Sequence, residues 1–185
     1  MAVRQTMAGL TRFAPQTGRP ALDLTNTRLG ARDLLTTPGD LERWFVAAGL
    51  TDHAPKVTRR ELESARMLRD GLRPALLAGD GPAVVVLAEG WLGRAPGRLR
   101  VEADTLQPRF DPSARTSCCL LVDAVLDALE LVRDRPGRVR ECAAPHCAYV
   151  YLDTSRNRSR RWCSMEKCGA RAKASAYYRR HRTGP

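Results

Sequence analysis

The sequence predicts a mainly α-helical fold with one small β-hairpin (α+β), followed by a compact cysteine-rich module at the C-terminal end. Three observations lead to this prediction. Leucine and alanine recur at helical spacing over much of the 185 residues. One segment near residue 100 alternates apolar and charged side chains, which favours a hairpin. Two pairs of cysteines, each spaced C-x4-C, lie in the last quarter of the chain.

We divide the chain into an N-terminal arm (residues 1–20), a helical domain (residues 21–137) and a C-terminal module (residues 138–185). Pro136 and Gly137 interrupt the last helical pattern and mark the second boundary. The arm has no continuous apolar segment typical of a secretory signal, and no run of eighteen apolar residues predicts a membrane span. We therefore expect a cytoplasmic protein with no membrane partner, in which thiols stay reduced.

Two helices are predicted in the first half of the helical domain. The first begins at Thr37 and Pro38 and ends at Gly49. The second begins at Thr58, which forms a capping box with Glu61. A proline at position 74 is expected to kink or shorten it. Their expected buried side chains are Leu41, Trp44, Phe45, Ala48, Leu62, Ala65, Leu68, Leu72 and Leu76.

The second half of the helical domain begins with Pro82, which favours a helix start, although three consecutive valines that follow also favour a strand. Residues 97–110 are predicted to form the hairpin. Asp111 and Pro112 would then cap and begin the last long helix. Its expected inward side chains are Cys118, Leu121, Val122, Val125, Leu129 and Val132, and we interpret both Cys118 and Cys119 as core thiols.

A polar island interrupts the leucine-rich start of the helical domain. It consists of Asp23, Asn26, Thr27 and Arg28. These side chains could line a pocket for a small-molecule effector. They could equally satisfy backbone groups or cap a helix, which is the more frequent role of such residues.

The four clustered cysteines predict one structural zinc ion. Cys142 and Cys147 form the first pair, and Cys163 and Cys168 form the second after a spacer of fifteen residues. Two close pairs separated in this way are typical of a four-cysteine zinc site, and four thiolates leave no position for a catalytic water. The spacer is expected to fold back as a hairpin, with a strand at residues 149–151. A helix would follow the last cysteine, which gives a treble-clef-like zinc finger.

Three alternatives to this zinc site remain open in the sequence. A disulfide pair would suit a secreted protein, for which no signal segment is present. His146 is adjacent to Cys147 and could replace it as a ligand. The cysteines could also be unrelated to one another.

The net charge is +11 and is concentrated in the cysteine-rich module. Residues 140–185 contain eleven lysines and arginines against three acidic residues. This imbalance predicts a polyanion as partner, with a solvated basic tail as the alternative. The predicted nucleic-acid contacts are Arg156, Arg158, Arg160, Arg161, Arg171, Lys173, Arg179 and Arg180.

Phosphates favour the start of the helix after Cys168, because free backbone N–H groups there add to the basic side chains. Some of the arginines could instead solvate the module or balance the charge of the thiolates. Trp162 is expected to pack against the finger rather than to stack on bases.

The run "RRWCSMEKCGARAKASAYYRR", with the cysteine pair before it, resembles the bacterial CGNR zinc fingers. The segments "ALDLTNT" and "DLLTTPGDLERWFVAAGL" are similar to the opening of the ABATE domain that accompanies them. The resemblance implies a stress-related transcription regulator in which the same four cysteines bind zinc. The sequence departs from the family's Cys-Gly-Asn-Arg at Ala170, so any capping or contact by that asparagine is not implied here.

We therefore expect a zinc-dependent, DNA-binding transcription regulator, with the helical domain as a ligand sensor or as a homodimerisation domain. The alternative is a zinc finger for RNA or a protein partner, joined to a helical ligand-binding domain. An enzyme is not expected, since the sequence contains no HExxH, GxSxG or phosphate-loop motif.

Overall fold

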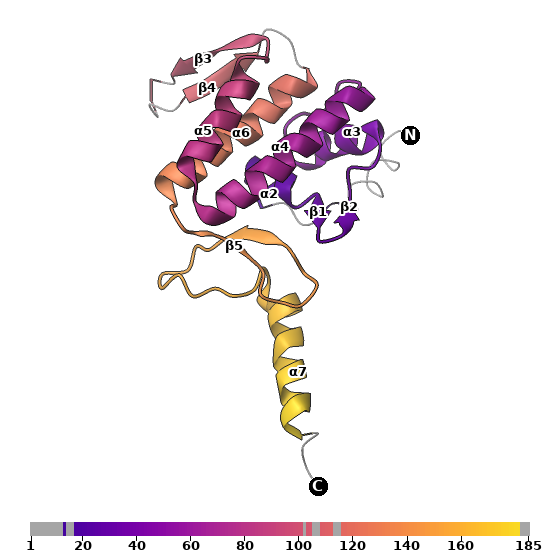
Figure 1. Cartoon of the computed structure of the whole chain (residues 1–185), viewed down its shortest axis with the longest axis vertical. Helices are drawn as coiled ribbons and strands as arrows, with labels where there is room; N and C mark the ends of the chain where they lie inside the picture. Colours follow the sequence, from indigo (N-terminus) through magenta and orange to yellow (C-terminus); the bar gives the residue numbers. More distant parts are fainter. Residues whose placement is uncertain (1–12, 14–16, 102, 105–107, 113–115, 182–185) are drawn as a thin grey trace.

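The computed structural model describes residues 13, 17–101, 103–104, 108–112 and 116–181. Figure 1 shows a helical body, a small module beneath it that contains strand β5, and a single helix that extends away from both. Most of the predicted N-terminal arm lies outside the described residues. None of the described helices is both long and apolar enough to cross a membrane.

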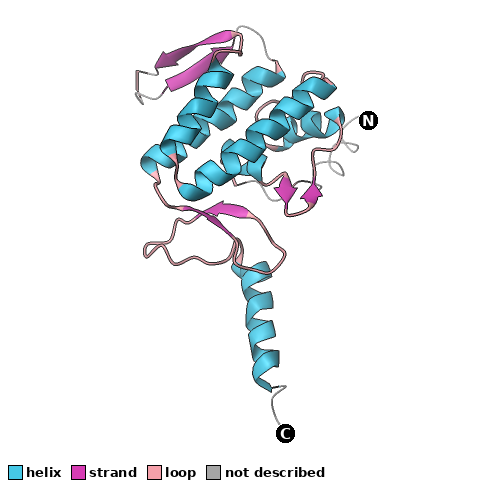
Figure 2. Cartoon of the chain, in the orientation of Figure 1, coloured by secondary structure: helices cyan, strands magenta, loops and turns pink. Residues whose placement is uncertain are grey.

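The helical body contains α2 (Pro20–Thr25), α3 (Pro38–Ala47), α4 (Arg59–Ala78), α5 (Gly81–Leu92) and α6 (Ser117–Asp134). Helix α6 packs against α2, α4 and α5, and α3 packs against α4. Their apolar faces enclose one main core, in which Trp44 and Phe45 are the fully buried aromatic side chains. The four helices predicted from Thr37 onward are thus present in the predicted order, and α2, which precedes them, was not predicted (Figure 2).

Helix α4 begins and ends with local signals in the sequence. Thr58 accepts a hydrogen bond from the Glu61 backbone N–H, and the Glu61 carboxylate accepts one from the Thr58 backbone. Gly79 ends the helix in the left-handed conformation, with φ of 68°. Pro74 was expected to kink or shorten α4, but the helix continues past it to Ala78, so the proline does not shorten it. The buried neighbours Ala75 and Leu76 hold the last turn against the core.

The predicted start of α6 is also wrong. Asp111 and Pro112 belong to strand β4 (Pro108–Pro112), which pairs antiparallel with β3 (Gly97–Val101). The helix is instead capped by Thr116, whose side chain accepts a hydrogen bond from the Cys119 N–H. Of the two thiols that were predicted to be buried, Cys119 is buried and Cys118 is only partly buried. The strand pairing with β3 outweighs the local capping signal, which moves the helix start by several residues.

Two further strand pairs complete the fold. Strands β1 (Arg28–Leu29) and β2 (Arg32–Asp33) form a short hairpin after α2. Strands β5 (Val139–Glu141) and β6 (Val150–Leu152) form the antiparallel hairpin of the C-terminal module.

The predicted strand at residues 149–151 is therefore present in large part as β6. It pairs with β5, which precedes Cys142, so the hairpin encloses the first cysteine pair instead of lying within the spacer. The module ends with the π-helical turn η1 (Met165–Gly169) and helix α7 (Ala170–His181). The second cysteine pair thus lies at a helix start, which gives the predicted treble-clef-like order of elements.

Candidate metal centre and nucleic-acid interface

The four predicted zinc ligands converge on one point. Cys142 follows β5 and Cys147 lies in the loop before β6, while Cys163 precedes η1 and Cys168 lies within it. Their sulfur atoms all lie within 4.8 Å of one another. The chain thus brings together two pairs of thiols that are separated by fifteen residues in the sequence.

The distances between these sulfurs fit a single tetrahedral ion. The Sγ atoms of Cys147, Cys163 and Cys168 are 3.6 to 3.7 Å apart. A tetrahedron with Zn–S bonds of ~2.3 Å has edges of ~3.8 Å, so the four thiols are positioned to bind one zinc ion. A disulfide requires sulfurs at about 2.05 Å, and all four cysteines are free. The alternative ligand His146 is exposed and is not part of this group.

The close approach of the four cysteines also shifts the pKa values of their thiols. Burial, together with the neighbouring thiols, raises the pKa of Cys147 to about 11 and raises that of Cys163 further. The pKa of Cys142 is lowered despite its burial, because the backbone N–H groups of Cys163 and Ala144 donate to its sulfur. Four crowded thiolates repel one another, and a dication offsets that repulsion when it binds.

The backbone beside the first cysteine pair adopts an uncommon conformation. His146 and Ala148 flank Cys147 and have φ angles of 63° and 53°. Residues other than glycine seldom adopt this left-handed region, and alanine does so less readily than histidine, asparagine or aspartate. This local cost was not evident from the sequence.

Apolar side chains surround the metal centre. Tyr149 and Trp162 pack with the cysteines in a small cluster that also contains the buried Tyr151. A Cβ atom at Gly169 would lie 3.0 Å from the Met165 sulfur and 3.3 Å from Cδ1 of Trp162. Trp162 therefore packs against the second cysteine pair, as its predicted role requires, and Gly169 leaves room for it.

Arg160 is engaged within the finger. Its Nε donates to the Trp162 carbonyl oxygen at 2.9 Å, and its Nη2 donates to the Cys163 carbonyl oxygen. The guanidinium lies 4.6 Å from the centre of the Tyr151 ring, and the Tyr151 hydroxyl donates to the Arg160 carbonyl. Arg160 thus holds the approach to the second cysteine pair, a role that the sequence did not reveal.

The other predicted nucleic-acid residues lie on the surface. Arg161 is exposed, with its guanidinium 5.2 Å from the centre of the Trp162 ring. Helix α7 buries none of its residues against the described parts of the chain, and Figure 1 shows it extending away from the body. The remaining exposed basic residues of this set are Arg156, Arg158, Arg171, Lys173, Arg179 and Arg180.

The polar island at the start of the helical domain is taken up by hydrogen bonds. Asn26 is 2% exposed, and its side-chain amide makes two hydrogen bonds with Val150 of β6, at 2.8 Å to the carbonyl and 2.7 Å from the N–H. Asp23 accepts from the Thr17 backbone, and Thr27 donates to the Leu24 carbonyl. Asn26 therefore connects the helical body to the finger across 124 positions of the sequence.

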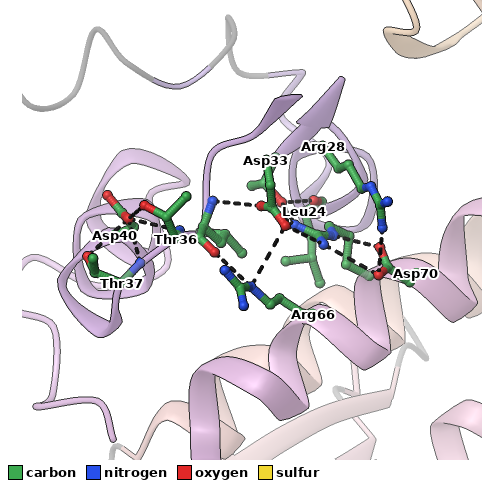
Figure 3. A network of polar contacts seen from close by, with 11 residues as sticks. Leu24, Arg28, Asp33, Thr36, Thr37, Asp40, Arg66 and Asp70 are labelled. Atoms are coloured by element: carbon green, nitrogen blue, oxygen red, sulfur yellow. Dashed lines mark hydrogen bonds and ion pairs between the residues drawn. The ribbon is translucent and has the colours of Figure 1, made fainter. Parts of the chain in front are cut away.

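Arg28, the fourth residue of the island, belongs to a second network on the body (Figure 3). It forms an ion pair with Asp70 at 3.1 Å. Arg69, next to Asp70 in the chain, is 1% exposed and makes a bidentate ion pair with Asp33 of β2, at 2.7 and 3.0 Å. Arg69 lies on the same face of α4 as the buried Ala65 and Leu72. An arginine at this apolar spacing was the feature of the sequence that could have indicated a buried ion pair. This network fixes the β1–β2 hairpin to α4.

A second connection, through Arg73, also joins the body to the finger. Arg73 of α4 donates to the Ala148 carbonyl at 2.7 Å and forms an ion pair with Glu141 at 2.9 Å. Val139 and Val150 of the finger hairpin are buried in the main core of the helical body. The metal centre is thus held against the body by both apolar and polar contacts.

Comparison with known protein families agrees with this architecture. Residues 138–181 match the CGNR zinc finger, and residues 18–135 match the family ABATE, described as "Putative stress-induced transcription regulator". A search of the curated proteins gave no match. Since the second match covers more than half of the chain, the protein belongs to the ABATE family and has a CGNR zinc finger at its C-terminal end.

Proposed function

We propose that this protein is a zinc-dependent, DNA-binding transcription regulator whose finger and helix α7 contact duplex DNA. The observation that carries the proposal is α7 itself. It projects from the metal centre with its basic side chains exposed and with no buried residue among the described parts. A helix that buries nothing is rarely stable alone in water, so a partner surface is its expected complement.

The arrangement of side chains around α7 suits a DNA groove. At about 100° per residue, Ala174, Tyr177 and His181 share one face. Lys173 and Arg180 flank this face on one side, and Arg171 flanks it on the other. A helix of this diameter fits the major groove, which is about 12 Å wide. The narrow, weakly charged face would meet the base edges, while the flanking cations would contact the phosphates of both strands.

If α7 contacts phosphates, the affinity for DNA should fall with salt concentration. About four to six contacts predict a slope near −4 to −5 for log affinity against log salt concentration. Replacing both Lys173 and Arg180 by alanine should weaken DNA binding by at least about tenfold and reduce the slope by about 2. Arg32→Ala with Arg59→Ala is the matched control, because both arginines are exposed on the helical body. Equal loss in the control, or none in the test variant, would contradict the proposal.

RNA is the second candidate partner, on one observation. Tyr177 and Tyr178 are 53% and 65% exposed, and exposed aromatic rings stack on the bases of single strands. Binding of duplex DNA and of single-stranded RNA, each with and without a zinc chelator, separates the two functions. Tighter RNA binding that Tyr178→Ala abolishes would favour the RNA function over the DNA function.

The helical body would serve such a regulator as an input domain, by binding an effector or by forming a homodimer. Support for this part comes from its contacts with the finger. Asn26 donates a hydrogen bond to Val150 of β6, and Arg73 donates one to Ala148, the residue after Cys147. A change in the helices that hold these side chains would therefore reach the metal centre directly.

A further inference from the structure

We propose that a cavity at the far end of the helical body, between α4, α5 and α6, binds a small aromatic carboxylate. The cavity has a volume of about 500 Å³, within the usual range of small-molecule sites. None of the residues in the polar island lines it. The site extends the proposed input role of the helical body, but binding of the ligand does not require that the finger bind DNA.

The floor of the cavity is apolar and partly aromatic. Trp91 and Leu121 lie there and are 6% and 1% exposed. Met67 stands at the rim, with 66% of its surface exposed. A thioether and an indole beside one another favour an aromatic ring as their ligand. The partly buried thiol of Cys118 lies in the same wall.

The main acidic group in the wall is already engaged. Glu61 accepts from the Thr58 N–H and hydroxyl, both at 2.7 Å, and from the Ser117 hydroxyl. These bonds hold the pKa of Glu61 below its ordinary value despite the opposing effect of burial. The ionised carboxylate therefore connects α4 to α6 and is not available to a ligand. The other acidic side chain, Glu63, is exposed at the edge.

Two arginines remain at the mouth, and they give the site its preference for an anion. Arg94 donates through Nε to the Gly90 carbonyl at 2.7 Å, and its guanidinium lies 5.1 Å from the centre of the Trp91 ring. Within the part of the chain that the structure describes, its Nη groups have no hydrogen-bond partner and Arg60 has no ion pair. A guanidinium held against an indole is placed to bind a carboxylate whose ring rests on the apolar floor.

Helix α4 connects this cavity to the finger. It contributes Arg60 and Met67 to the cavity and, further along, Arg73 to the Ala148 carbonyl. A ligand that orders the first turns of α4 would therefore act on a helix that also holds the metal site.

The test uses the full zinc-loaded chain with benzoate, salicylate, phenylacetate and indole-3-acetate as probes. Benzyl alcohol and benzylamine serve as neutral and cationic counterparts. Calorimetry measures affinity, and protection of Cys118 from a maleimide locates the ligand. We expect at least one of the carboxylates to bind saturably, to protect Cys118, and to bind at least tenfold more tightly than both counterparts.

Two variants test the site, and one variant controls for it. Arg94→Met should weaken carboxylate binding at least tenfold, and Ser64→Trp, which places an indole at the cavity wall, should abolish it. Arg98→Met is the matched control, because Arg98 is also exposed and does not line the cavity.

No saturable binding by any of the four carboxylates would overturn the proposal, and so would unchanged binding in Arg94→Met. If the full zinc-loaded chain binds a carboxylate but does not bind DNA, the result counts against the proposed function alone.

Discussion

At the scale of single residues, the backbone beside the metal centre is strained. Ala148 follows the second zinc ligand with φ of 53°, and its carbonyl accepts the hydrogen bond from Arg73. Alanine differs from glycine here only by its Cβ, which makes this left-handed backbone conformation unfavourable. The neighbouring Ala143 follows Cys142 and has a negative φ, so it is an ordinary loop alanine.

Ala148→Gly should therefore stabilise the zinc-loaded protein by about 0.5–1 kcal/mol. The left-handed conformation costs a non-glycine residue ~1–2 kcal/mol, and the extra freedom of glycine in the unfolded chain cancels part of that gain. Thermal or denaturant unfolding at constant zinc measures the change. Ala143→Gly, the control, should destabilise by about 0.5–1 kcal/mol. If both variants destabilise equally, the strain at Ala148 is not real.

At the scale of elements, the turn η1 sets how closely α7 approaches the metal. Gly169 is buried at the end of η1, where a side chain would meet Met165 and Trp162. Met165 is 57% exposed and can move aside, but Trp162 packs in the cluster around the cysteines. Ala170, the next residue, is exposed and helical, so the family's asparagine would lie on the surface of α7 at this position.

Gly169→Ala should destabilise the finger by about 1–2 kcal/mol, because overpacking forces Trp162 or the turn to shift. Zinc content should stay at one ion per chain, since no ligand is removed. Ala170→Asn is the control at the adjacent position, and a cost of at most about 0.7 kcal/mol is expected from helix propensity alone. Competition with a chromogenic chelator reports the loss as faster zinc release. Equal release from both variants would show that Gly169 is not a close-packing position.

At the scale of the whole molecule, the body and the finger share one core. Val139 and Val150 are buried with the leucines of the helical body, and Asn26 satisfies both backbone groups of Val150. Zinc binding fixes the loop between the two strands that carry these valines. The stability of the helical body should therefore depend on the metal, although every zinc ligand lies outside it.

Asn26→Ala should lower the free energy of unfolding by about 2–4 kcal/mol, because it leaves two buried backbone groups without a partner. In the parent protein, a zinc chelator should lower the melting temperature of the helical body. In Asn26→Ala that effect should shrink, since the connection is already weakened. Asn157→Ala, at an exposed turn of the finger, is the control and should change stability by less than about 0.5 kcal/mol. A chelator effect as large in Asn26→Ala as in the parent would mean that Asn26 does not couple the two parts.

The sequence allowed some of these features to be predicted and not others. The capping box at Thr58 and Glu61 and the four cysteines are local patterns whose physical meaning depends on a few neighbouring positions. The start of α6 was predicted wrongly at Asp111, because a strand pairing with β3 competes with the cap. The binding role of the basic residues and of the polar island stays a prediction, and the structure shows which of these side chains are exposed and which are engaged.

By itself, the sequence determined the order of the helices from α3 onward, the zinc-ligand set and the concentration of positive charge near the metal. These follow from periodicity, ligand chemistry and composition, which act over short spans of chain. Only the tertiary structure decided that Asn26 bonds to Val150, that Arg160 is bound within the finger, and that a cavity opens between α4, α5 and α6. Each of these depends on contacts between segments that meet only when the chain is folded, so no local pattern encodes them.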